Sequence, residues 1–163
     1  MNLHIMKIST DAELEAILDV IHRSHATVAA EFGLTCENCP KHTAFLPLIF
    51  LQTQRSWGWI MAGLYDGEAL VGYVSLSDAG EGTWELHNLS VLPEYRHNGC
   101  GKMLLDFAEA TVKDAGGSRI KIGIIEENTR LRRWYEANGY LHTGTKKFEH
   151  LPFTTGFMEL IIV

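Results

Sequence analysis

Short runs in which apolar and polar residues alternate recur along the chain, a pattern typical of strands with one buried face. The clearest run places Ile120, Ile122 and Ile124 at every second position. Further runs predict strands at residues 3–8, 59–65, 69–77, 84–92, 140–148 and 157–162. Asp66-Gly67, between the second and third of these ranges, favours a hairpin turn. The hydrophobic pattern therefore indicates a sheet built from many short strands.

Helical spacing of apolar residues separates several of these strands. Leucine and isoleucine recur at intervals of three and four over residues 14–21, and Thr10 and Glu13 ahead of them form a capping box. Further helices are expected at residues 26–32, 44–51 and 128–138, and from Gly99 or Cys100 to Gly116-Gly117 with Leu104, Phe107, Ala108 and Val112 buried. This order of elements predicts an α/β fold with a mixed sheet and flanking helices.

Composition places the chain among ordinary globular proteins. Of its 163 residues, 46% are hydrophobic and 21% are charged, which excludes a mainly disordered chain. No linker, repeat or low-complexity segment divides the sequence, so we expect a single domain over residues 1–163. The net charge of −6 argues against nucleic acid or an anionic membrane as a partner.

No segment fits export or membrane insertion. The first ten residues lack the apolar run of about 7–15 residues that a signal peptide carries. The longest apolar run, residues 44–51, is interrupted by Pro47 and falls short of the ~20 residues that span a bilayer. We therefore expect a cytoplasmic protein whose three cysteines are reduced thiols.

One segment, Arg96-His97-Asn98-Gly99-Cys100-Gly101-Lys102, lies between a predicted strand and a predicted helix. Glycines let a ligand approach the backbone, and the free N–H groups and dipole of a helix N-terminus favour a phosphate. Residues 96–133 carry a net charge of +3 in this acidic chain, which favours a compact polyanionic ligand. The alternatives are a simple turn before a helix and ordinary solvated charge.

Two common phosphate-binding loops do not match this segment. A Walker A loop requires glycine where Arg96 stands and serine or threonine where Met103 stands. A dinucleotide-binding loop requires a small residue where Leu104 stands. The segment fits a third form instead, Arg/Gln-x-x-Gly-x-Gly/Ala.

Flanking segments extend this match. Residues 85–95 end in Val91-Leu92-Pro93-Glu94-Tyr95, which fits V-x-P-x-Y/F before the arginine of the loop. Asn128 and then Trp134-Tyr135-Glu136-Ala137-Asn138-Gly139-Tyr140 fit a later helix and the strand after it. In this order and spacing the sequence resembles the GNAT acetyltransferase superfamily over residues 58–163, and more weakly over residues 36–57.

The resemblance implies a GNAT-like fold, with two central parallel strands that splay apart, and acetyl-CoA as co-substrate. The cofactor-binding residues it implies are Leu89, Val91, Arg96, His97, Asn98, Gly99, Cys100, Gly101, Lys102 and Asn128. The pantetheine arm would meet unpaired backbone groups from Leu89 to Val91. Gly123 fits either close approach of a ligand or a bulge, and Asn128 either contacts the arm or caps a helix. Arg130, Arg132 and Arg133 are candidates for the 3′-phosphate.

Acyl transfer to an amine requires loss of a proton from the amine and an acid for the leaving thiolate. The resemblance implies that Tyr135 is this acid, since a phenol with a pKa of about 10 is protonated at neutral pH. Strand alternation places Glu85, His87, Leu89 and Val91 on one face. Glu85 or His87 is then the expected base, directly or through water, unless positioning alone suffices.

The expected activity is direct transfer of an acetyl group from acetyl-CoA to the primary amine of a small molecule. The expected assembly is compatible with a homodimer, the commonest oligomer. A protein or peptide acceptor, or a non-catalytic acetyl-CoA sensor, are the alternatives. The acceptor side would draw on His22, His25, Trp57, Trp59, Phe148, His150 and Phe153. Cys36 and Cys39 allow a metal- or redox-responsive regulator, but no second cysteine pair completes a site, so no metal is expected.

Overall fold

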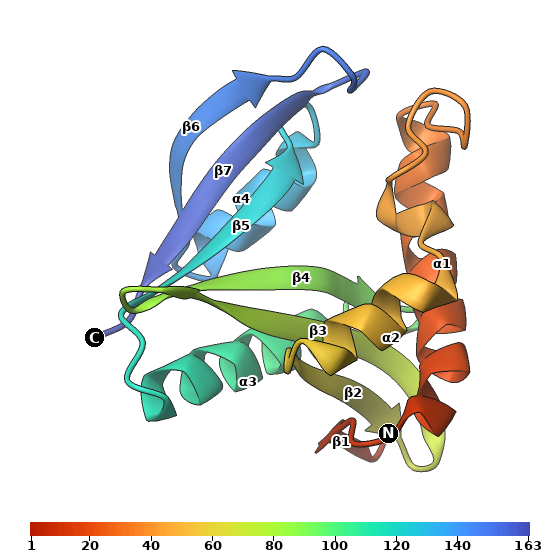
Figure 1. The fold of residues 1–163 in the computed structure, drawn as a ribbon, viewed down its shortest axis with the longest axis vertical. Coiled ribbons are helices and arrows are strands. Elements are labelled where there is room, and N and C mark those ends of the chain that lie inside the picture. Colours follow the sequence, from red (N-terminus) through yellow and green to blue (C-terminus); the bar gives the residue numbers. More distant parts are fainter.

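Seven strands form one mixed sheet in the order β1-β2-β3-β4-β5-β7-β6 (Figure 1), as the computed structural model of residues 1–163 shows. The strands are β1 (Leu3–Lys7), β2 (Ile60–Asp66), β3 (Ala69–Gly80), β4 (Thr83–Val91), β5 (Arg119–Ile125), β6 (Leu141–Lys147) and β7 (Thr154–Ile161). The helices are α1 (Leu14–Glu31), α2 (Leu48–Ser56), α3 (Cys100–Asp114) and α4 (Thr129–Ala137), with short 3-10 turns η1 (Asp11–Glu13), η2 (Thr43–Phe45) and η3 (Pro93–Tyr95). The α/β fold with a mixed sheet is confirmed.

The centre of the sheet divides at the one parallel pair, β4 and β5. These strands pair only at Thr83↔Arg119, Trp84↔Ile120 and Glu85↔Lys121. Beyond this point β4 continues to Val91 and β5 to Ile125 without pairing to each other. Figure 1 shows the two strands diverging from a common origin. The expected splay of the central strands is therefore confirmed.

A bulge in β4 accompanies the divergence. Ser75 on β3 pairs with His87, whereas Tyr73 pairs with Ser90, so β4 holds one extra residue between these pairs. Asn88, inside this segment, has a positive φ of 54°. An extra residue reverses which face the following side chains occupy.

The bulge makes one prediction wrong. Glu85 and His87 lie opposite Ser77 and Ser75. They share the face of Tyr73, which packs with residues of α1 and α2. The side chains of Leu89 and Val91 instead pack against the core that includes the apolar residues of α3. The four residues therefore do not share one face, because the alternation stops at Asn88.

Helix α1 is continuous where the sequence predicted two helices. Its buried residues, Leu14, Ile17, Val20, Ile21, Ser24 and Ala29, span most of its length. The polar segment 22–25 is therefore a helical turn that carries polar side chains toward the sheet, not a break. The Thr10 side chain makes no capping bond to the backbone; its hydroxyl donates to the Glu13 carboxylate at 3.1 Å. The predicted capping box is wrong in this respect.

The segment predicted as a helix at residues 44–51 is divided by Pro47. The residue before a proline favours an extended backbone, and Leu46 has φ −56° and ψ 124°. Turn η2 therefore ends there, and α2 starts after Pro47 and runs to Ser56. Leu51 of α2 is fully buried with Leu14, Ile17 and Ile21 of α1. Nowhere in the chain is a helix both long enough and apolar enough for a membrane span.

Candidate active site

The loop before α3 forms a cradle of unpaired backbone amides. The first amide of α3 with a backbone acceptor is that of Met103, which donates to the carbonyl of Gly99 at 3.0 Å. The amides of Cys100, Gly101 and Lys102 precede it and have no acceptor inside the helix. This geometry offers several N–H donors, together with the positive end of the helix dipole, to an anion.

Two glycines of this cradle are required by its geometry. Gly99 is the N-cap of α3 and has a φ of 79°, a conformation that other residues rarely adopt. A Cβ on Gly101 would lie 2.7 Å from the Trp134 ring of α4. Cys100 contributes only its backbone, because its side chain is buried in the core below.

A cavity of about 860 Å³ connects the cradle with the gap between β4 and β5. Its lining includes most of the expected cofactor-binding residues, namely Leu89, Val91, Arg96, His97, Gly99, Cys100, Gly101, Lys102 and Asn128. Asn98 does not line it; its side-chain amide donates to the backbone carbonyls of Tyr95 and Arg96 at 3.2 and 3.1 Å, which braces the loop. Gly123 lines the cavity in regular register with Phe157, so it does not mark a bulge.

Helix α1 supplies hydrogen-bond partners to the free edge of β4. The amide of Val91 donates to Ser24 Oγ at 3.1 Å, and His25 Nε2 lies 3.0 Å from the Leu89 carbonyl oxygen. Two backbone groups that we expected to be unpaired therefore have partners. Sequence motifs gave no indication of Ser24; its position on the buried face of α1, three residues after Ile21, was the available signal.

Arg96 joins the cradle to the same helix. Its guanidinium donates to the Ser24 carbonyl at 2.8 Å and to the Thr27 hydroxyl at 3.0 Å. The side chain also lines the cavity. Arg96 therefore adds positive charge beside the cradle and fixes α1 against it.

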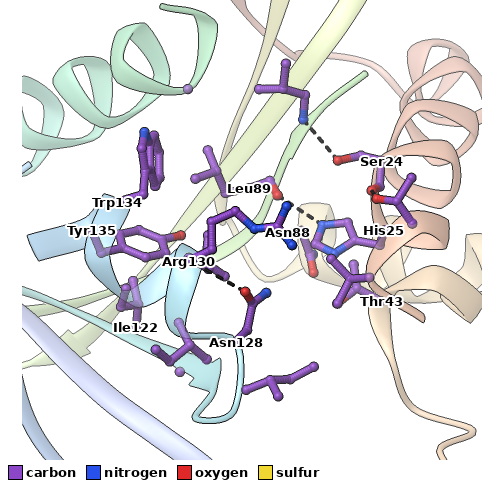
Figure 2. A pocket seen from close by; sticks show the side chains of 18 of the residues that line it. Ser24, His25, Thr43, Asn88, Leu89, Ile122, Asn128, Arg130, Trp134 and Tyr135 are labelled. Atoms are coloured by element: carbon purple, nitrogen blue, oxygen red, sulfur yellow. Dashed lines mark hydrogen bonds between the residues drawn. The ribbon is translucent and has the colours of Figure 1, made fainter. Parts of the chain in front are cut away.

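Across the cavity, α4 presents Tyr135 and its N-cap Asn128 (Figure 2). Tyr135 is 5% exposed, and burial raises the pKa of its phenol above the ordinary value, so the hydroxyl carries its proton at neutral pH. Asn128 Oδ1 accepts the Leu131 amide at 3.2 Å. Asn128 therefore caps α4, which confirms one of the two roles that the sequence left open; it also lines the cavity, and contact with the cofactor arm stays a prediction.

Glu85 and His87 form a separate cluster on the face that α1 and α2 cover. The His87 ring stacks on Trp59 at 4.2 Å between centroids. Its Nε2 lies 2.8 Å from Ser77 Oγ and 3.6 Å from Glu85 Oε2. Burial lowers the pKa of His87 and the Glu85 carboxylate opposes this shift. Neither residue lines the cavity, so the structure does not bring the expected base next to Tyr135.

Of the three arginines considered for a phosphate, only Arg130 lines the cavity, where it pairs with Glu31 of α1 at 2.9 Å. Arg132 forms an ion pair with Glu126 at 2.8 Å.

The two cysteines considered for a metal or redox role are not bonded to each other: Cys36 is an exposed free thiol and Cys39 a buried one. No group of three or more histidine, cysteine, aspartate or glutamate side chains is arranged to hold a metal ion.

These features together define a protein that can hold an extended ligand with a diphosphate between two diverging strands. Residues 27–140 match the model of the acetyltransferase (GNAT) family. The chain is 33% identical over 132 residues to uncharacterized N-acetyltransferases of Mycobacterium bovis and Mycobacterium tuberculosis, covering 76% of this chain and 84% of theirs. The chain belongs to the GNAT family and is an acetyl-CoA-dependent N-acetyltransferase.

Solved structures share the fold at low sequence identity. The ribosomal-protein-S18-alanine N-acetyltransferase of Escherichia coli superposes with a TM-score of 0.78 at 16% identity, over 98% of this chain and 94% of that one. The PaiA N-acetyltransferase of Thermoplasma acidophilum, solved with coenzyme A, gives a TM-score of 0.76 at 21% identity, over 99% of both chains. These similarities confirm the GNAT-like sheet.

The cradle can be tested with two glycines that share one backbone conformation. Gly99 and Gly116 lie at opposite ends of α3, and both have a φ of 79°. A Cβ added at either position would have no neighbouring atom within 4 Å. Alanine at either position should cost about 1 kcal/mol of stability. Gly99→Ala should also weaken coenzyme A binding about tenfold or more, since the amides would be redirected. Calorimetric titration that finds equal affinities in the two variants would contradict the cradle.

Proposed function

We propose that the protein transfers the acetyl group of acetyl-CoA to the primary amine of a small molecule by direct attack on the thioester. Support for a small acceptor comes from the far end of the cavity, which is covered by apolar packing. Leu151 and Phe153, between β6 and β7, pack with a cluster that contains Ala29 of α1, Cys39 and Ile125 of β5. Leu151, Phe153 and Cys39 also line the cavity. This roof, formed by Leu151, Phe153 and Cys39, is the support for a small acceptor in the proposal.

In the proposed reaction Tyr135 protonates the leaving thiolate of coenzyme A. The phenol lies buried in the cavity wall, and its raised pKa keeps it protonated at neutral pH, so it can give its proton to the sulfur as the C–S bond breaks. The phenolate then regains a proton from the one that the attacking amine releases, through water. The cradle amides and the charges of Arg96 and Lys102 would hold the diphosphate. Asn128 and the edge of β4 would align the pantetheine arm.

Glu85 is the base in this proposal, and His87 positions it. The Glu85 carboxylate is 49% exposed and can receive a proton through water, whereas the His87 ring is immobilised between Trp59 and Ser77. Because Glu85 does not line the cavity, a water relay is required between the amine and the carboxylate.

A panel of acceptors tests the proposed function. Polyamines, aminoglycosides and amino acids should be compared with peptides that carry a free N-terminus or a lysine, by release of the coenzyme A thiol. The best small amine should exceed the best peptide in kcat/KM by about tenfold or more, since the roof excludes a polypeptide. A peptide that surpasses every small amine, or acetyl-CoA binding with no amine acetylated, would contradict it.

Tyr135→Phe should lower kcat about a hundredfold with the affinity for coenzyme A unchanged, since only the acidic proton is lost. Tyr140→Phe is a matched control. The Tyr140 ring lies 5.3 Å from that of Tyr135, its hydroxyl is buried without a partner, and it does not line the cavity. Steady-state kinetics should show a near-normal kcat for the control. Similar kcat values in both variants would rule out Tyr135 as the acid.

Glu85→Gln should lower kcat about a hundredfold at neutral pH, because the amide has the carboxylate's shape but cannot accept the proton. His87→Gln should have a smaller effect. The Glu85 charge raises the pKa of His87, so its removal lowers that pKa further and leaves the ring neutral to lower pH. If His87 were the base, Glu85→Gln would retain kcat and move the acidic limb of kcat/KM to lower pH, which the pH profile would reveal.

A further inference from the structure

His25 is the histidine of α1 that reaches the free edge of β4, at Leu89. Figure 2 shows it on the α1 side of the pocket, opposite Tyr135 and Asn128. Its Nε2 contacts the Leu89 carbonyl oxygen at 3.0 Å, and its ring lines the cavity. None of the roles assigned to the cradle, Tyr135 or the Glu85 cluster makes use of this side chain.

The contact with Leu89 determines the tautomer of His25. A carbonyl oxygen can only accept, so Nε2 carries the proton. Burial, together with the nearby His42 and Arg96 and against the opposing effect of the Leu89 carbonyl, lowers the pKa of His25 to about 4, so the ring is neutral near pH 7. A neutral ring with hydrogen on Nε2 has an unprotonated Nδ1. No protein group donates a hydrogen bond to this Nδ1.

His25 lines the cavity, so an N–H or O–H group of a bound ligand can replace water as the donor to its unprotonated nitrogen. We propose that Nδ1 of His25 accepts a hydrogen bond from an amide N–H of the pantetheine arm of acetyl-CoA. In the proposed function the arm runs along the free edge of β4, where the Leu89 carbonyl already accepts from His25. In this proposal the ring occupies the Leu89 carbonyl with its Nε2–H and offers Nδ1 to the arm as the acceptor instead.

The low pKa of His25 suits a hydrogen-bond acceptor and not a catalytic base. An alkylammonium has a pKa of about 10, and a ring whose pKa is about 4 cannot take its proton effectively. A neutral amide N–H, which keeps its proton, is the matching donor. Both amides of the pantetheine arm have this group. The proposal concerns acetyl-CoA alone and does not depend on the identity of the acceptor.

The substitution His25→Gln separates the two nitrogens. The glutamine amide N–H can replace Nε2–H at the Leu89 carbonyl, but it places no acceptor at the position of Nδ1. Titration calorimetry should show about three- to tenfold weaker binding of coenzyme A, with thermal stability near that of the unmodified protein. Adenosine 3′,5′-diphosphate, which lacks the pantetheine arm, should bind both proteins equally.

His22→Gln is the matched control. His22 lies one turn earlier on α1, and its Nε2 also contacts a backbone carbonyl, that of Leu46, at 2.7 Å, but it does not line the cavity. Coenzyme A should bind this variant normally. Equal coenzyme A affinity in His25→Gln and His22→Gln would overturn the proposal, since His25 would then serve only to satisfy Leu89.

A measurement on the unmodified protein avoids any folding defect of the variants. The 15N resonance of His25 Nδ1 should have the chemical shift of an unprotonated nitrogen and should move upfield when coenzyme A is added, as a new hydrogen bond forms. Adenosine 3′,5′-diphosphate should leave it in place. A resonance that is insensitive to coenzyme A would also overturn the proposal. Because neither readout uses an amine, failure of the proposed acceptor class would not affect them.

Discussion

The separation of β4 from β5 is the constraint on which the rest of the site depends. A strand edge inside a protein carries donors and acceptors that cost free energy when they lack partners. Here the paired segment ends at Glu85 and Lys121, and the remaining edge must be satisfied in another way. Ser24 and His25 of α1 bond to this edge at Val91 and Leu89. Two side chains of α1 thus take the place of a neighbouring strand at Val91 and Leu89, where β4 and β5 have separated.

The same helix links the two halves of the site. Arg96 of the cradle bonds to Ser24 and Thr27, while Ala29, further along α1, packs into the roof with Ile125 of β5 and Phe153. Glu31 at its end pairs with Arg130 of α4. A displacement of α1 would therefore alter the cradle, the free edge and the roof together. The continuity of α1 through residues 22–25 is what makes this coupling possible, because a break there would release one contact from the next.

The sequence predicted the cofactor half of the site better than its catalytic half. The strand pattern, the glycine loop and the helix after Gly99 predicted the sheet and the cradle, since each depends on local backbone preference. The bulge at Asn88 has a signal that strict alternation overlooks: the apolar positions shift from Trp84 and Leu86 to Leu89 and Val91, with two polar residues between them. That single extra residue moved Glu85 and His87 to the other face from Leu89. Likewise, Pro47 marked the break before α2, but hydrophobicity alone carried the predicted helix through it.

This difference has a physical origin in how the two ligands are held. A diphosphate and an extended arm are recognised largely by backbone groups, so the sequence records them as glycines and as strand and helix boundaries. In the proposed function the acceptor meets side chains from segments distant in sequence, such as Cys39 and Phe153 in the cavity wall. No short motif joins such residues, because only the tertiary fold brings them near one another. His25 lies at the boundary between the two kinds of recognition: a side chain from α1 that acts through a backbone carbonyl of β4. Its proposed role follows from two facts together: the Leu89 carbonyl fixes the tautomer of the ring, and the ring lines the cavity.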